Sequence, residues 1–159
     1  MKLRHHVIIT TSITLLLFIL ALVVALFGMQ TTKNRFQQFI EVDQALLNEE
    51  TTMYAQGLQM GQALRNIVME PSDQVAYRNL DNAAQIFENA LEQARQIAHA
   101  DPKSLQRLAA IASIRQRHIE EQERVKSILQ NQPAAIRAVR ENETPVWREM
   151  RALLIESIN

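Results

Sequence analysis

An uncharged apolar stretch near the N-terminus constrains this chain more than any other feature. Residues 7–27 read VIITTSITLLLFILALVVALF and contain no Asp, Glu, Lys or Arg. As an α-helix this stretch is about 31 Å long, enough to cross a bilayer core of roughly 30 Å. We therefore expect residues 1–28 to be a cytoplasmic N-terminus and a transmembrane helix, and residues 29–159 to form one domain beyond the membrane.

A cleaved signal peptide is the alternative interpretation of the same stretch. Signal peptides have an apolar core of roughly 7–15 residues, followed by small residues at the cleavage site. Here the apolar run is longer, and Leu26, Phe27 and Met29 surround Gly28. These bulky side chains favour an uncleaved anchor.

Basic residues flank the stretch on both sides. Lys2 and Arg4 precede it, and Lys33 and Arg35 follow it. The positive-inside bias is therefore nearly balanced. A very short N-terminal flank followed by a long polar domain favours a cytoplasmic N-terminus. We expect a single N-terminal span in the inner (cytoplasmic) membrane of a bacterium, with the domain in the periplasm.

The composition excludes several classes of function. The chain has 17 basic and 17 acidic residues, and it contains no cysteine. The basic residues are scattered, so the basic stripe that nucleic acid requires is missing. Without cysteine, disulfides, thiolate catalysis and covalent haem attachment are excluded.

Apolar residues after the stretch recur at helical spacing, and prolines divide the chain into helices. Three breaks are expected, at Glu70-Pro71, Asp101-Pro102 and Asn131-Gln132-Pro133, with Ser72 or Asp73 capping the second helix. The predicted fold is all-α: an N-terminal transmembrane helix that continues into an up-down-up-down four-helix bundle. The predicted seams are Phe39, Leu46, Met53, Met60 and Ile67, with Ile40, Leu47, Tyr54, Gly61 and Val68, on the first helix; Ala76, Leu80, Ala83, Phe87, Ala90, Ala94 and Ile97 on the second; and Leu108, Ile111, Arg115, His118, Gln122, Val125 and Leu129 on the third.

The fourth helix is expected to be interrupted. It begins near Pro133, and Thr144-Pro145 resembles a second cap followed by proline at the first helical position. Trp147 follows this restart, and burial in the core or in an interface is the expected place for a tryptophan.

Two segments resemble the four-helix-bundle ligand-binding regions of bacterial methyl-accepting chemotaxis proteins. They are Ala-Leu-Arg-Asn-Ile-Val-Met-Glu-Pro-Ser at 63–72 and Glu-Thr-Pro-Val-Trp-Arg at 143–148, together with the N-terminal anchor flanked by Lys and Arg. The resemblance implies a homodimeric sensor of small molecules that signals by small displacements of the last helix. Such receptors continue into a second span and a cytoplasmic coiled coil, neither of which follows here before Asn159.

The function predicted from these observations is the sensory input domain of a chemotaxis transducer. The chain is expected to bind a small, possibly anionic, ligand outside the cytoplasm. Two alternatives stay open: the input domain of a sensor histidine kinase, and a membrane-anchored helical scaffold that binds only other helices. The coding sequence beyond Asn159 would distinguish the first two.

Polar residues interrupt the seam of the third helix, and they are the candidate ligand-binding residues. Antiparallel helices place residues 57–61 opposite residues 115–121, so Arg115, His118 and Gln122 are expected near Gly57 and Gly61, with Arg65 one turn beyond. A buried Arg needs a charge partner, which a carboxylate ligand or a Glu of the bundle would provide. The two glycines allow a close helix contact or a void for the ligand.

No enzymatic activity, metal or cofactor is expected. The sequence lacks a nucleophile elbow and a phosphate-binding loop. His99 and His118 lack the Glu-x-x-His spacing of di-iron bundles, because Gln96 and Arg115 precede them by three residues. Asp43 and Glu50 are expected on an exposed or dimer-flanking stripe rather than as an acid pair.

Overall fold

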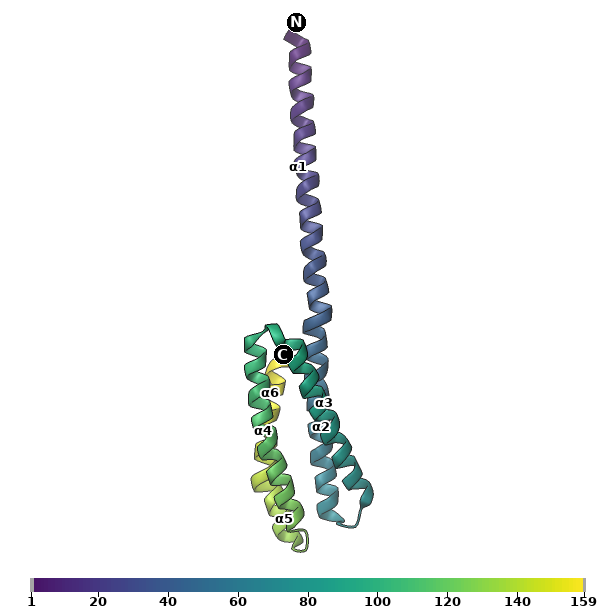
Figure 1. Ribbon diagram of the computed structural model, residues 1–159, viewed down its shortest axis with the longest axis vertical. Coiled ribbons are helices and arrows are strands. Elements are labelled where there is room, and N and C mark those ends of the chain that lie inside the picture. Colours follow the sequence, from purple (N-terminus) through teal and green to yellow (C-terminus); the bar gives the residue numbers. More distant parts are fainter. Residues whose placement is uncertain (1, 159) are drawn as a thin grey trace. The chain divides into compact units, whose positions relative to one another are not determined.

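The computed structural model describes the backbone of residues 2–158 and the side chains of residues 11–156, apart from Ser12 and Gln38. Over these residues the chain is helical, without a strand (Figure 1), as the predicted all-α class requires. It divides into two compact units, Met1–Glu41 and Val42–Asn159. The side chains of Lys2 and Arg4, on which the expected orientation depends, lie outside the described residues.

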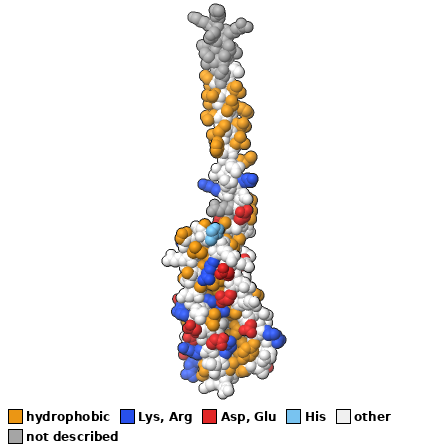
Figure 2. Space-filling model, viewed as in Figure 1, with side chains coloured by type: hydrophobic (Ala, Val, Ile, Leu, Met, Phe, Trp, Pro, Cys, Tyr) orange, Lys and Arg blue, Asp and Glu red, His pale blue; other side chains and the backbone are white. Residues whose placement is uncertain are grey.

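The first unit is helix α1 (Lys2–Gln38) with the start of a π-helical turn, η1 (Phe39–Asp43). Among the described residues, one helix is long and apolar enough to cross a membrane, and no part of its apolar window is buried. Leu16, Phe18 and Phe27 are 68%, 65% and 72% exposed. Figure 2 shows apolar side chains along this helix. An apolar surface of this extent is poorly solvated by water, which is consistent with a membrane anchor.

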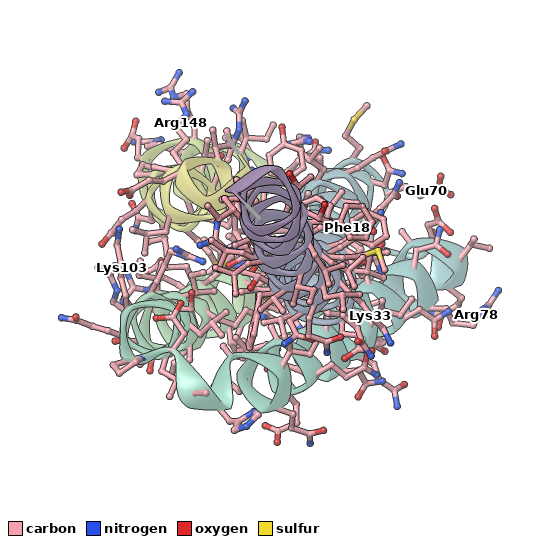
Figure 3. The ribbon with its side chains drawn as sticks, turned by 90° about the horizontal axis from the view of Figure 1, so that it is seen from above. Phe18, Lys33, Glu70, Arg78, Lys103 and Arg148 are labelled. Atoms are coloured by element: carbon pink, nitrogen blue, oxygen red, sulfur yellow. The ribbon has the colours of Figure 1, made fainter. Side chains whose placement is uncertain are left out.

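The second unit is a helical bundle. It contains α2 (Gln44–Met69), α3 (Gln74–Ile97), α4 (Pro102–Ser127), α5 (Gln132–Ala138) and α6 (Thr144–Ile158), with a 3-10 turn η2 (Ala98–Ala100) and a second π-helical turn η3 (Val139–Glu143). Figure 3 looks along the bundle, and the labelled side chains of Arg78, Lys103 and Arg148 lie at its periphery. Charged groups on the outside and apolar groups inside are the arrangement that burial energetics favours.

Side-chain caps begin three of these helices, as the prolines and their neighbours predict. Backbone N–H groups in the first turns donate hydrogen bonds of 2.8–3.2 Å to side-chain oxygens of the capping residues. These residues are Asp73 before α3, Asp101 before α4 and Asn131 before α5. Pro102 and Pro133 occupy the first turns of α4 and α5, where no intrahelical N–H bond is lost. The three predicted breaks are therefore confirmed.

The main core cluster is built from α2, α3, α4 and α6, and α3 contributes the most residues. The predicted seam of α3 is buried from Ala76 to Ala94, and Met53, Met60 and Ile67 of α2 are fully buried against it. The alanines let the two helices approach closely because they place few atoms between the backbones. The first part of the seam predicted for the first helix is exposed instead, since Phe39 in η1 is 54% exposed and Leu47 in α2 is 39% exposed.

The predicted restart at Thr144-Pro145 is wrong. Thr144 has helical dihedral angles, φ −61° and ψ −39°, and its backbone N–H donates to the carbonyl of Val139, five residues back. Pro145 cannot donate an N–H, and its ring would clash with the carbonyl four residues before it in a regular α-helix. The wider π-helical turn η3 accommodates the proline, so α5, η3 and α6 follow one another as continuous helix.

The cap Asp101 makes the bundle sensitive to acid. The Ser104 hydroxyl, together with the backbone N–H groups of Lys103 and Ser104, lowers the pKa of the Asp101 carboxyl below its usual value of 3.8. Because the folded-state pKa is the lower one, the stabilisation is fully present above the unfolded-state pKa, about pH 4. It is lost as the pH falls through the folded-state pKa.

We expect Asp101→Asn to lower the melting temperature at neutral pH and to reduce the further fall as the pH drops below about 4. Asn caps a helix well but carries no charge, so the melting temperatures of the two proteins should converge in acid. Circular dichroism melting of the full-length protein in detergent over a pH series measures this. Identical pH profiles for the two proteins, offset by a constant, would contradict the role given to the carboxylate.

Candidate functional site

Polar side chains form a layer across the middle of the bundle. We define this buried polar layer as Arg115, His118 and Gln122 of α4 and Glu143 of η3, together with Glu88 of α3 at its outer edge, whose side chain is 48% exposed. The three residues of α4 are three and four positions apart, so they share one helix face. They are 3%, 0% and 4% exposed. The structure therefore brings together three of the residues that the sequence nominates for ligand binding.

Arg115 is neutralised by the protein itself. Its Nε donates to Oε1 of Glu88 at 3.0 Å, and its Nη1 donates to Oε1 of Gln122 at 3.4 Å. The guanidinium also lies over the ring of Phe87, 5.4 Å from the centroid. Burial lowers the pKa of Arg115, and the nearby Glu88 carboxylate opposes this shift. A Glu of the bundle is thus the charge partner, which is one of the two possibilities that the sequence left open.

His118 has partners on both ring nitrogens. Nη1 of Arg115 lies 3.4 Å from Nδ1, and Oε1 of Glu143 lies 2.7 Å from Nε2. Because a guanidinium only donates, Nδ1 must accept, and the ring proton belongs on Nε2. The Nε2–H group then donates to the Glu143 carboxylate.

Glu143 extends this chain of hydrogen bonds to the last helix. It is the final residue of the π-helical turn η3, and its side chain is 2% exposed. The hydroxyl of Thr144, the first residue of α6, donates to its Oε2 at 3.2 Å. Hydrogen bonds between side chains therefore connect α3, α4 and the start of α6 through the centre of the bundle.

The space beside Gly57 is filled. A Cβ atom added to Gly57 would overlap Cζ3 and Cη2 of Trp147, whereas one added to Gly61 would lie 3.7 Å from Nη1 of Arg65. Trp147 also faces His118, with ring centroids 6.2 Å apart. Of the two interpretations of the glycines, close packing is confirmed at Gly57, and the proposed void is occupied by the indole of α6. Trp147 is buried, as expected.

Arg65 lies apart from the buried polar layer. It is exposed, and it lines a groove of about 410 Å³ between α2 and the segment α5–η3–α6. We call this the arginine groove. Its lining consists of Arg65, Val68, Met69, Ile136, Val139, Arg140 and Thr144. The floor is apolar, two guanidinium groups border it, and no carboxylate lines it.

A second groove, of about 270 Å³, lies between α3 and α4 beside the buried polar layer. Arg115 and Lys126 line it, but so do three acidic residues, Asp81, Glu88 and Glu123. Nε2 of Gln122 is buried here without a hydrogen-bond partner among the described residues. The excess of carboxylates disfavours an anion in this groove. Direct ligand contact by Arg115, His118 and Gln122 remains a prediction.

Glu50 corrects another expectation. Asp43 is exposed, but Glu50 is 1% exposed, and it accepts a hydrogen bond from Nη2 of Arg107 at 2.8 Å. Glu50 follows Leu46 by four residues and precedes Met53 by three, which places it on the core face of α2. That spacing is visible in the sequence and could have predicted the burial.

The described residues contain no group of three His, Cys, Asp or Glu side chains that could hold a metal ion. His99 is exposed, and its Nδ1 lies 2.9 Å from the backbone carbonyl of Gln96. The partners of His118 are side chains of the bundle. Neither histidine therefore has the carboxylate-rich surroundings of a dinuclear site.

Comparisons with protein-family models, with curated proteins and with solved structures find no match for this chain. The two grooves and the buried polar layer are therefore the features from which a function can be inferred.

Gly57 and Gly61 provide a matched pair for testing the packing. We expect Gly57→Ala to destabilise the bundle by about 1–3 kcal/mol, because the indole of Trp147 must move to admit a methyl group. Gly61→Ala should be neutral or stabilising by up to about 1 kcal/mol, since its Cβ fits and alanine favours the helix. Urea unfolding in detergent measures both. Equal effects of the two changes would argue against the close contact.

The buried pair of His118 and Glu143 has an exposed counterpart in the ion pair of Arg117 and Glu149, whose side chains are 50% and 53% exposed. We expect Glu143→Ala to cost about 1–3 kcal/mol, because it leaves the Nε2–H group of His118 and the hydroxyl of Thr144 without their acceptor. Glu149→Ala should cost less than about 1 kcal/mol. Unfolding free energies of the two variants provide the comparison, and a cost below about 1 kcal/mol for Glu143→Ala would contradict the assigned network.

Proposed function

We propose that this chain is the sensory input region of a membrane-anchored chemotaxis transducer. In this proposal α1 spans the inner membrane, the bundle lies in the periplasm with its helices alternating up and down, and a small anionic ligand binds there. Binding is passed on by displacement of α6. The role is that of a receptor rather than an enzyme.

The arginine groove is the observation that carries the proposal. Arg65 makes no ion pair within the part of the chain that the structure describes. Arg140 pairs with Glu141 at 2.8 Å, but these side chains are 75% and 51% exposed, so the pair is weak. A carboxylate entering the groove would gain charge-assisted hydrogen bonds without displacing a buried partner.

The position of the groove supports a role in signalling. Its wall contains Val139 and Arg140 of the π-helical turn, and Thr144 at the start of α6. Turns of this kind often occur at functional sites, because they are less regular than the α-helix around them. The Thr144 hydroxyl joins the groove to Glu143, and Glu143 joins it to His118. In this scheme the buried polar layer positions α6 and does not contact the ligand.

The exposed face of α2 supports the expected homodimer. From Gln44 to Gln62 its exposed residues carry no charge, and they include Leu47 and Leu58, which are 39% and 44% exposed. Interfaces between copies favour uncharged helix faces, because buried charges would need partners. A second copy packed along α2 would cover both leucines.

Ligand binding can be tested on the full-length protein in nanodiscs with a panel of organic acids and amino acids. We expect at least one anion to raise the melting temperature, and Arg65→Gln to remove most of that shift. Arg78→Gln, a change at an exposed arginine of α3, is the matched control and should leave it unchanged. A broad panel that produces no shift would instead favour the helical scaffold.

Displacement of α6 can be measured in the same samples. The chain contains no cysteine, so spin labels at Arg78→Cys and Arg148→Cys report one distance between α3 and α6. We expect the ligand to change this distance by about 1–2 Å, the scale of known helix displacements. Arg115→Gln should retain binding and lose the displacement. Loss of binding by Arg115→Gln with no effect of Arg65→Gln would move the site to the buried polar layer.

A further inference from the structure

The lining of the arginine groove restricts the kind of anion that fits it. Val68 and Val139 are 3% and 8% exposed and form the floor, while Met69 and Ile136 are 75% and 53% exposed and form apolar walls. The charged groups on the lining are the two guanidiniums. The other polar side chain is Thr144, whose hydroxyl already donates to Glu143.

We propose that the ligand is a monocarboxylate with an apolar body, the size of a short-chain or medium-chain fatty acid. This inference rests on the proposed function and specifies the ligand of the same groove. The carboxylate binds at Arg65 and the hydrocarbon lies over Val68, Val139 and Ile136. The volume of about 410 Å³ falls within the range of small-molecule sites.

The groove disfavours ligands with a second charged group, because its lining has few polar groups to pair with that charge. Arg140, the other guanidinium of the lining, is paired with Glu141, so a second carboxylate that reached it would have to displace that partner. A second carboxylate elsewhere in the groove would lie against Met69 and Ile136, without a hydrogen-bond donor to replace water. An α-ammonium group would lie near two guanidiniums without a carboxylate in the lining to balance it. A dicarboxylate and an amino acid therefore both lose solvation that a monocarboxylate keeps.

Titration calorimetry of the full-length protein in nanodiscs provides the test, with three ligands of equal chain length. Hexanoate is the expected ligand, hexanedioate adds a second carboxylate, and norleucine adds an ammonium group. We expect hexanoate to bind at least about tenfold more tightly than either. Hexanamide, which has the same hydrocarbon and no charge, should bind at least about tenfold more weakly than hexanoate.

Two substitutions of isoleucine by lysine give a matched control. Ile136→Lys places a cation among the apolar walls. It should therefore reduce the ratio of the binding affinities of hexanoate and hexanedioate. Ile86→Lys makes the same change on α3, where Ile86 is 44% exposed and outside the groove, and should leave the ratio unchanged. Both positions are exposed, so both variants are expected to fold.

The outcomes of these experiments distinguish a failure of the monocarboxylate inference from a failure of the proposed function. If hexanedioate or norleucine binds as tightly as hexanoate and Arg65→Gln weakens them all, the groove binds anions but the monocarboxylate inference is wrong. If none of the three ligands binds, or if Arg65→Gln leaves hexanoate binding unchanged, the proposed use of the groove fails as well. If Ile136→Lys instead dissociates a dimer that hexanoate does not affect, the groove is an interface between copies and the inference is overturned.

Discussion

Polar groups buried at the centre of an apolar bundle need hydrogen-bond partners within the protein, and the packing of α3, α4 and α6 depends on this requirement. Arg115 is 3% exposed and reaches a carboxylate of α3, while His118 is fully buried and reaches a carboxylate at the end of η3. Removing Glu88 or Glu143 leaves a buried donor of Arg115 or His118 without its acceptor, and the cost of an unpaired buried donor exceeds that of a lost surface contact. The helices are therefore fixed in register by polar contacts as well as by apolar packing.

The same requirement explains the irregularity of the last helix. Ala135, Val139, Glu143 and Trp147 are all buried, and they follow one another at intervals of four residues. A regular α-helix with 3.6 residues per turn would rotate such a series away from the core. The π-helical turn, which is wider than an α-helical turn, compensates for this rotation. It keeps Glu143 within hydrogen-bond distance of His118 and Trp147 in contact with Gly57. Pro145 makes a regular α-helix costly at this point, so the local strain and the tertiary contact favour the same geometry.

The arginine groove and the buried polar layer differ in the two properties that matter for the proposed sensor, which are unpaired charge and access to solvent. The groove has unused positive charge, an apolar floor and access to solvent. Arg115, His118, Gln122 and Glu143 of the layer have almost no access to solvent, whereas Glu88 is half exposed at its edge. The hydrogen bonds of the layer reach from α3 to α6. A site that both bound the ligand and fixed the core would lose stability whenever the ligand departed. In the proposed sensor, connection through Thr144 and Glu143 would let the groove change occupancy while the layer keeps the bundle folded.

Local chemistry made much of the fold predictable from sequence. The capping residues before prolines and the heptad spacing of Ala76 to Ala94 act within one or two helical turns, so they require no knowledge of the neighbours. The burial of Arg115, His118 and Gln122 also followed from their spacing along α4. Glu50 was misassigned although its spacing pointed inward, because its partner Arg107 lies 57 residues away. The sequence did not predict the π-helical turn, because Thr144-Pro145 resembles a capping residue followed by proline at the first position of a helix.

The sequence by itself determined that this is a helical chain with an apolar N-terminal helix, where its main breaks fall, and which faces of its helices are buried. Those properties depend on composition and on periods of a few residues. Only the tertiary structure decided that Glu88 pairs with Arg115 and Glu143 with His118, that Trp147 fills the space beside Gly57, and that Arg65 faces a different groove from Arg115. These are contacts between residues distant in sequence, and their free energies depend on distances and burial that arise only when the helices pack.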